Sequence, residues 1–256
     1  MNATGSIILL PLGIFLVVTE PVRGPGAWFL LGTILFHVAY FITLSRAYAM
    51  ADLSIVYPIS RGLGSAIVPI IGILILHETV AFAAAIGIAL VILGIWAIYE
   101  MTHRQTTILN PINLLSSQGT QYALLTGIII ALYSTWDKVG VTYVHPLLYM
   151  YSITLGVTLM LIPYQVRVYG LKTIRAEWKR SLRPIIAGSL MAFSAYALVL
   201  IALTTSRVSY VAPSREVGLV FGLFLGWLVL KEKTTKGRTM GSVSIVAGLI
   251  LLGISP

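Results

Sequence analysis

The sequence predicts an all-α membrane protein: a polytopic bundle of about nine transmembrane helices, arranged as two inverted-topology repeats of four plus five helices. Three observations predict this fold class. The mean hydropathy is +0.95. Only 10% of residues are charged, whereas a soluble domain carries about 25%. The apolar residues fall in nine long runs, and two stretches of the chain repeat each other at a shift of 154 residues.

The apolar runs are separated by short polar segments. They cover residues 6–20, 26–48, 53–76, 80–99, 119–139, 144–166, 183–203, 208–230 and 236–254. A membrane-spanning helix needs about 20 apolar residues, and most of the runs meet that length. The first run is short, but Met1 to Gly5 contains no Lys or Arg. We therefore expect a helix there and not a signal peptide.

The internal repeat appears when the ends of two apolar runs are aligned without gaps. His77-Glu78 falls on Lys231-Glu232, and Ser60-Arg61 falls on Ser214-Arg215. Glycines recur at the same shift of 154 residues, as Gly64 and Gly218, Gly72 and Gly226, Gly87 and Gly241, and Gly94 and Gly248. A duplication in so apolar a chain is typical of transporters that are built from two related halves.

The repeat divides the predicted helices between two halves. Residues 1–100 form a first half with four helices, 101–118 a linker, and 119–256 a second half with five helices. Run 119–139 has no partner in the first half, because its twin would lie before Met1. We therefore expect a parent of five plus five helices, of which the first helix is missing in this sequence.

Each half contains a characteristic set of polar, glycine and proline residues. In the first half it comprises Ala51-Asp52-Leu53-Ser54, Tyr57-Pro58, Arg61-Gly62, Pro69, Glu78, Gly87 and Gly94. In the second half it comprises Ser209-Tyr210-Val211-Ala212-Pro213, Arg215-Glu216, Gly226, Glu232, Gly241 and Gly248. This pattern resembles the EamA family of the drug/metabolite transporter superfamily over nearly the whole chain. The resemblance implies a transporter without specifying the substrate, since the family carries many metabolites.

Charged residues inside the apolar runs are the strongest functional candidates. Arg61 lies about eight residues into its helix, which is a depth of roughly 12 Å at 1.5 Å per residue. Arg215 occupies the matching place in the second half, beside Glu216. An arginine at the centre of a spanning helix costs about 2.5–3.5 kcal/mol on insertion scales. Two explanations stay open: an ion pair with Glu216 or a headgroup, or a central site where a guanidinium binds an anionic group.

Glu216 has two interpretations of its own. As the permanent partner of an arginine it stays ionised, and as a proton carrier it couples transport to protons. Adjacent residues on a helix do not face each other, so Arg215 is a poor partner. Arg61 of the related helix is the better one if the two helices cross.

Aromatic and imidazole side chains complete the predicted substrate site. They are Tyr57, His37, Tyr40, Tyr196 and Trp136. For His37 the alternative is a hydrogen-bonded core residue, and for the aromatic residues it is a belt at the membrane interface. Asp137-Lys138 at the end of its run is expected to be a solvated pair, and Glu78 and Glu232 are expected in loops.

Prolines and glycines predict how two of the helices pack. Pro58, Pro69 and Pro213 each remove an amide donor, so their helices are expected to line a cavity or to kink. Gly218, Gly222 and Gly226 form a stripe at intervals of four residues. Such a stripe predicts a close approach of another helix.

The sequence also argues against several classes of function. It has no cysteine, no paired metal-ligand spacing, no phosphate-binding loop and no nucleophile motif, so we expect no enzyme, no metal and no cofactor. The net charge of +9 arises in loops, which indicates anionic lipid headgroups and not nucleic acid. The expected partners are a small-molecule substrate and membrane lipid, in a monomer or homodimer.

Loop charges predict the orientation in the cell (inner) membrane. Loops on one side carry 12 Lys and Arg, and loops on the other carry 3. The positive-inside rule places the 12 in the cytoplasm, whereas the resemblance implies the opposite orientation. The predicted function is secondary active transport, most simply export, of small polar metabolites such as amino acids or organic anions by alternating access. The alternative is a non-transporting membrane interaction or assembly protein, or a degenerate paralog.

Overall fold

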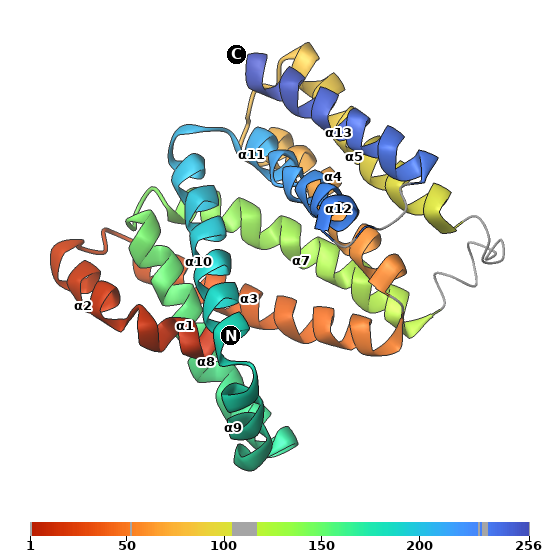
Figure 1. Ribbon diagram of the computed structural model, residues 1–256. Helices are drawn as coiled ribbons and strands as arrows, with labels where there is room; N and C mark the ends of the chain where they lie inside the picture. The colour runs from red at the N-terminus through yellow and green to blue at the C-terminus, as the bar shows by residue number, and fades with distance from the viewer. Residues whose placement is uncertain (1, 52, 104–116, 230, 232–234, 256) are drawn as a thin grey trace. The chain divides into compact units, whose positions relative to one another are not determined.

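The computed structural model describes residues 2–51, 53–103, 117–229, 231 and 235–255, and every regular element in them is a helix (Figure 1). The helices are α1 (Asn2–Ile8), α2 (Leu10–Thr19), α3 (Gly26–Met50), α4 (Leu53–Leu74), α5 (Phe82–His103), α7 (Gln118–Gly140), α8 (Pro146–Tyr169), α9 (Leu171–Arg180), α10 (Leu182–Thr205), α11 (Val208–Ser214), α12 (Val217–Val229) and α13 (Lys236–Ile254). The predicted all-α fold class is confirmed. Most of the predicted linker, and Glu232, lie outside the described residues.

Each of the nine predicted apolar runs coincides with one helix or with a broken pair of helices. Among the described residues, five spans are long and apolar enough to cross a membrane: α3, α8, α10, α13 and the pair α11–α12. The pair α1–α2 forms a sixth if its 64° bend lies within one span. A polytopic membrane bundle is therefore confirmed, while the count of nine spans stays a prediction.

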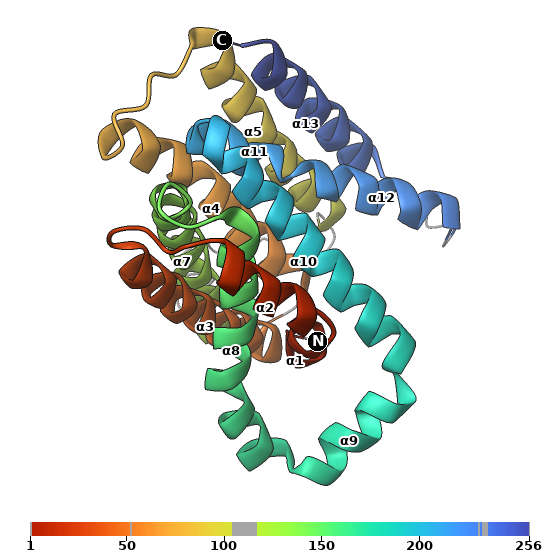
Figure 2. The same ribbon diagram turned by 90° about the vertical axis from the view of Figure 1, so that its left-hand side faces the viewer.

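The chain forms two compact units. Unit 1 comprises Met1–Ala39 and Trp136–Thr205, and unit 2 comprises Tyr40–Thr135 and Ser206–Pro256. Each unit therefore contains residues from both predicted halves of the sequence. In unit 1, helix α1 packs against α8 and α10, and α9 joins these two helices (Figure 2).

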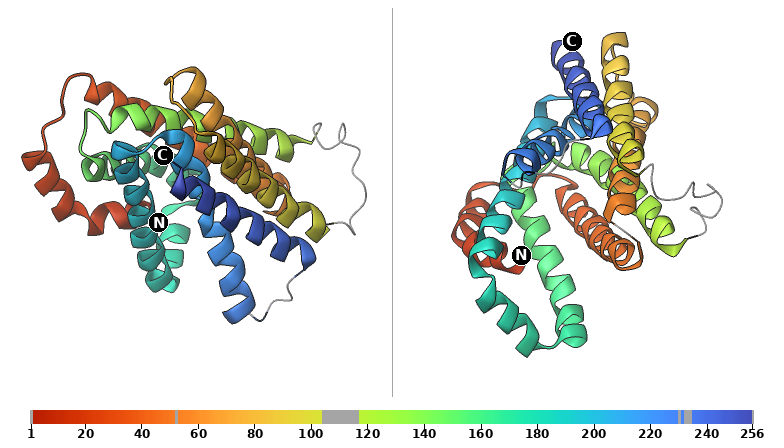
Figure 3. Two further views of the ribbon diagram at one scale, coloured as in Figure 1. Left: turned by 90° about the horizontal axis from the view of Figure 1, so that it is seen from above. Right: turned by 45° about the vertical axis from the view of Figure 1, so that its right-hand side comes forward.

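In unit 2 the repeat can be followed as an inverted pair of helices, α5 and α13, which lie side by side (Figure 3). A Cβ added to Gly87 would lie 2.7 Å from the carbonyl oxygen of Gly248, and one added to Gly241 would lie 2.5 Å from that of Gly94. The helices are antiparallel, because the higher number on one meets the lower number on the other. Gly87 corresponds to Gly241, and Gly94 corresponds to Gly248, so the repeat converts each of the two contacts into the other. A pseudo-twofold axis between the helices requires this relation.

Two further observations in unit 2 agree with this axis. Ser244 Oγ donates a hydrogen bond of 2.7 Å to the carbonyl oxygen of Leu90, a residue 154 positions away, so repeat-related residues meet each other. His77 and Lys231, which are also related by the shift, both adopt left-handed backbone with φ of 54° and 55°. Non-glycine residues rarely adopt this conformation, so the repeat extends to local backbone geometry.

The loop that follows α4 holds the start of α11. Glu78 lies in this loop, as predicted, and its carboxylate accepts hydrogen bonds from Val208 N at 2.8 Å and from Ser209 N at 3.0 Å. The first amides of a helix have no partner within the helix and carry partial positive charge. Glu78 therefore satisfies and stabilises the beginning of α11, which leads directly to the candidate site.

The predicted glycine stripe on α12 does not pack as expected. A Cβ added to Gly218 or Gly222 meets no atom within 4 Å, and the surroundings of Gly226 lie outside the description. The close contacts form instead at Gly64, whose added Cβ would lie 2.7 Å from Ile130 of α7, and along α5 and α13. Spacing alone shows that a helix face is smooth, but not which face meets a neighbour.

A methyl group at the α5–α13 crossing tests this packing. Gly241→Ala places its Cβ against the backbone oxygen of Gly94, which cannot rotate away, so we expect a loss of about 1–3 kcal/mol from overpacking. Gly253→Ala on the same helix is the matched control, because nothing lies within 4 Å of its Cβ. Thermal unfolding of the purified protein should show a lower midpoint for Gly241→Ala alone. Equal midpoints for the two variants would contradict the contact.

Candidate functional site

The two repeat-related helices differ at the position of their arginines. α4 is helical through Arg61, whereas Arg215 and Glu216 form the break between α11 and α12. At the break, Glu216 N donates to the carbonyl oxygen of Pro213 at 3.0 Å, a spacing of three residues and not four. Pro213 has no amide of its own and disrupts the helical ladder. Broken helices within spans are where transporters place their binding groups.

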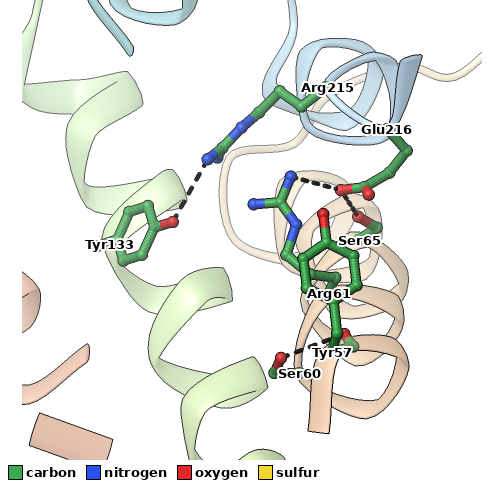
Figure 4. Close-up of polar contacts among 7 residues, drawn as sticks. All are labelled: Tyr57, Ser60, Arg61, Ser65, Tyr133, Arg215 and Glu216. Carbon is green, nitrogen blue, oxygen red and sulfur yellow. Dashed lines mark hydrogen bonds and ion pairs between the residues drawn. The ribbon is translucent and has the colours of Figure 1, made fainter. Parts of the chain in front are cut away.

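Glu216 is held by two side chains of α4 (Figure 4). Arg61 Nη2 lies 3.1 Å from Glu216 Oε1, and Ser65 Oγ donates to the same oxygen at 3.0 Å. Glu216 is only 2% exposed, and the Arg61 side chain is 21% exposed. The sequence analysis favoured Arg61 as the partner of Glu216, and the structure shows this ion pair.

The pair retains unused hydrogen-bonding capacity. In the part of the chain that the structure describes, the buried Arg61 Nε and Glu216 Oε2 have no hydrogen-bond partner. A buried charged group is costly when its donors and acceptors are not all satisfied. One donor of Arg61 and one acceptor of Glu216 are therefore left unsatisfied among the described residues.

Arg215 points to a different helix. Its Nη2 lies 3.5 Å from the hydroxyl of Tyr133 on α7 (Figure 4), and Tyr133 is itself 3% exposed. The ring of Tyr40 packs edge-on against that of Tyr133 at 5.8 Å. Arg215 is half-buried beside these aromatic rings. A guanidinium bordered by tyrosines offers both charge and apolar surface to a ligand.

The internal symmetry of the site is incomplete in one respect. Arg215 corresponds to Arg61 at the shift of 154, but Glu216 corresponds to Gly62. Unit 2 thus brings two guanidinium groups and one carboxylate to one region. Among the described residues of this cluster, the guanidinium groups outnumber the carboxylates by one.

Five of the eight predicted site residues belong to unit 2. Tyr57 lies one turn before Arg61 on α4 (Figure 4), and it joins Arg61, Arg215, Glu216 and Tyr40. Tyr133 was not among the predicted site residues, although as a tyrosine within a spanning run it was a candidate for lining a cavity or for the belt at the membrane interface. His37, Tyr196 and Trp136 belong to unit 1.

The prediction that Asp137 is exposed to solvent is wrong. Instead of a solvated pair with Lys138, Asp137 is 0% exposed. Tyr149 OH donates to its Oδ1 at 2.9 Å, and Tyr196 OH donates to its Oδ2 at 2.6 Å. α7 continues to Gly140, so Asp137 lies within the helix and not after it. The carboxylate joins α7 to α8 and α10.

The other two predicted residues of unit 1 have core contacts. His37 is 7% exposed, and its Nδ1 lies 2.8 Å from the carbonyl oxygen of Thr33 and 3.2 Å from the hydroxyl of Thr33. Its ring packs at 5.5 Å against that of Tyr196. Trp136 Nε1 donates to the carbonyl oxygen of Phe29 at 2.9 Å. Each of these side chains thus makes the contacts of a packed interior.

A metal centre finds no support in the described residues, because no group of three or more His, Asp or Glu side chains is placed to hold an ion there. The charged groups of the unit 2 cluster are the guanidinium groups of Arg61 and Arg215 and the carboxylate of Glu216.

Comparison with known proteins identifies the family. The sequence profile of the EamA-like transporter family matches residues 117–254, which is more than half of the chain. The chain belongs to the EamA-like transporter family. This EamA-like protein also matches the profile of the small multidrug resistance proteins over residues 23–91. Both families consist of multi-pass membrane transporters, so the chain is a multi-pass membrane transporter of the drug/metabolite type.

The fold of this EamA-like transporter is also found in a solved structure. A crystal structure, described only as that of a protein, covers 99% of this chain and 84% of its own, with a TM-score of 0.76 and 14% sequence identity. At this identity the likeness concerns the fold alone. No significant match is found among curated proteins.

Proposed function

We propose that this EamA-like protein is a secondary active exporter of small polar metabolites that carry an anionic group, such as amino acids or organic anions. Arg215 and Arg61 supply the positive charge at the substrate site, Glu216 fixes Arg61, and Tyr40, Tyr57 and Tyr133 border the site. The substrate binds at the broken helix and is exchanged between the two sides by alternating access.

The observation that carries this proposal is that, among the described residues, two arginines and one carboxylate meet at the break between α11 and α12. Arg61 forms an ion pair with Glu216 at 3.1 Å, and Arg215 Nη2 lies 3.5 Å from the hydroxyl of Tyr133. A planar guanidinium binds carboxylate or phosphate oxygens through two parallel hydrogen bonds. The cost of placing a second arginine in a span is offset when such a ligand binds.

The contacts of Glu216 favour one of its two interpretations. Arg61 and Ser65 both engage Oε1 of this carboxylate, which is the arrangement expected of a fixed partner and not of a proton carrier. The rival proposal, a membrane protein that does not transport, predicts that both arginines serve only structural contacts. The two proposals therefore differ most clearly at Arg215.

Ligand-dependent thermal stabilisation of the purified protein tests the proposed substrate class. A ligand that binds the folded state raises the unfolding temperature. The panel should contain organic anions and amino acids, together with their uncharged amides and matched cationic amines. We expect stabilisation by members that carry a carboxylate or phosphate and not by their uncharged counterparts. Stabilisation confined to cationic members would contradict the proposal.

A further inference from the structure

The helix α9 connects α8 to α10 in unit 1 and is exposed along its whole length. None of its residues is buried, and Figure 2 shows it bridging the ends of these two helices. Its ten residues are too few to span a membrane, since they measure only about 15 Å at 1.5 Å per residue. Its exposed surface therefore requires an explanation of its own.

Two stripes of side chains run along α9. The apolar residues Leu171, Ile174 and Trp178 recur at intervals of three and four, so they share one face of the helix. Leu171 is 67% exposed and Trp178 is 45% exposed. The basic stripe has the same spacing, displaced by one residue, and consists of Lys172, Arg175 and Lys179. The basic stripe therefore lies directly beside the apolar one.

The contacts of α9 with unit 1 leave both stripes accessible. Trp178 Nε1 donates a hydrogen bond of 3.2 Å to Thr4 Oγ1 of α1, which holds one point of the helix. Glu177, the one acidic residue of α9, accepts a hydrogen bond of 2.8 Å from Ser181 Oγ. Arg167 and Arg183 flank the helix, so residues 167–183 contain six basic side chains and one acidic one.

We propose that α9 is an in-plane anchor that binds the anionic lipid surface of the membrane. Leu171, Ile174 and Trp178 enter the boundary between headgroups and acyl chains, as the apolar face of an interfacial helix does. Lys172, Arg175 and Lys179 extend to the lipid phosphates beside them.

The position of α9 in the chain selects lipid as the occupant. α9 follows α8 after a single residue and precedes α10 after a single residue, and both of these helices qualify as membrane spans. The nearest surface to their joined ends is that of the bilayer. Tyr164 and Tyr169 at the end of α8 are 57% and 63% exposed, which agrees with an aromatic belt at the same interface.

The anchor also decides the orientation of the chain. The loop that contains α9 supplies six of the basic residues on the more positive side. Anionic lipids are concentrated in the cytoplasmic leaflet of many membranes, and the positive-inside rule assigns the same side. The anchor therefore places the end of α8 and the start of α10 at the cytoplasmic surface.

The absence of cysteine from the sequence allows a direct test with single labels on the full-length protein. Ile174→Cys places an environment-sensitive fluorophore in the apolar stripe, and Ala176→Cys, on the opposite side of the helix, is the matched control. Both proteins are reconstituted in vesicles of phosphatidylcholine alone and of phosphatidylcholine with phosphatidylglycerol. We expect a blue-shifted label at position 174 that brominated lipid quenches, a label at 176 that stays in water, and a larger difference with phosphatidylglycerol.

The basic stripe is tested by combining Lys172→Gln, Arg175→Gln and Lys179→Gln. Each removed charge should lower the ratio of docked to undocked helix about five-fold in vesicles with phosphatidylglycerol, and by much less in phosphatidylcholine alone. The proposal is overturned if the labels at 174 and 176 respond alike. It is also overturned if the response at 174 is the same in both lipids, since the charge complementarity would then be absent.

Discussion

Arg215→Ala is expected to lower transport strongly while leaving the protein folded. The variant removes the guanidinium that faces Tyr133 and leaves the ion pair of Arg61 and Glu216 intact. A hydrogen bond to a charged group contributes about 1.5–3 kcal/mol, so substrate affinity should fall about 10- to 150-fold. Uptake of the best ligand into proteoliposomes, together with the unfolding temperature of the same preparation, measures both effects.

Arg46→Ala is the matched control for this variant. Arg46 also belongs to unit 2, and its Nη1 donates to a tyrosine hydroxyl, that of Tyr122, at 2.9 Å. Both variants thus remove a guanidinium that contacts a tyrosine hydroxyl, but only Arg215 lies at the break between α11 and α12. If the two variants lose transport to the same extent, or if Arg215→Ala transports normally, Arg215 is not a substrate-binding residue.

Arg61→Ala is expected to destabilise the protein, a result different from that for Arg215→Ala. Removing Arg61 leaves the carboxylate of Glu216, which is 2% exposed, without its counter-charge. Breaking one side of a buried ion pair costs about 3–5 kcal/mol. Thermal or denaturant unfolding of the purified variant should therefore show a much lower midpoint than that of the wild-type protein.

The double variant Arg61→Ala with Glu216→Gln separates the two roles of Arg61. Glutamine is uncharged and can still accept the hydrogen bond from Ser65, so the double variant should recover most of the lost stability. If it recovers stability and also transports, Arg61 is a structural partner and only Arg215 binds substrate. If it recovers stability without transport, Arg61 contributes to the site as proposed. No recovery at all would contradict the ion pair itself.

The sequence predicted the helices well because each spanning run has to be long and apolar. The glycines that recur at the shift of 154 residues lie at the crossing of α5 and α13, although the pairing of these two helices was not predicted. The partner of Glu216 followed from the helical period, which directs adjacent residues apart. These features depend on local spacing, and local spacing is visible in one sequence.

Features that depend on which helix face packs against which neighbouring helix could not be predicted from the sequence. Asp137 lies near the end of the apolar run 119–139 and was therefore expected to be solvated. α7 continues past it to Gly140, and its carboxylate accepts hydrogen bonds from tyrosines of α8 and α10. The glycines of α12 have the spacing of a packing face and meet nothing within 4 Å at Gly218 or Gly222. The prolines were expected to kink or open either helix, but they did not indicate which one: α4 contains two prolines and remains helical, whereas the related helix breaks after Pro213.

The affinity of a matched pair of ligands tests the central claim most directly. The pair consists of the best anionic ligand and its uncharged amide, and each is measured by equilibrium binding to the wild-type protein and to Arg215→Ala. We expect the wild-type protein to prefer the anion by at least about 10-fold, and we expect this preference to disappear in Arg215→Ala. An equal preference for the anion in both proteins would show that the charge of the substrate is recognised elsewhere.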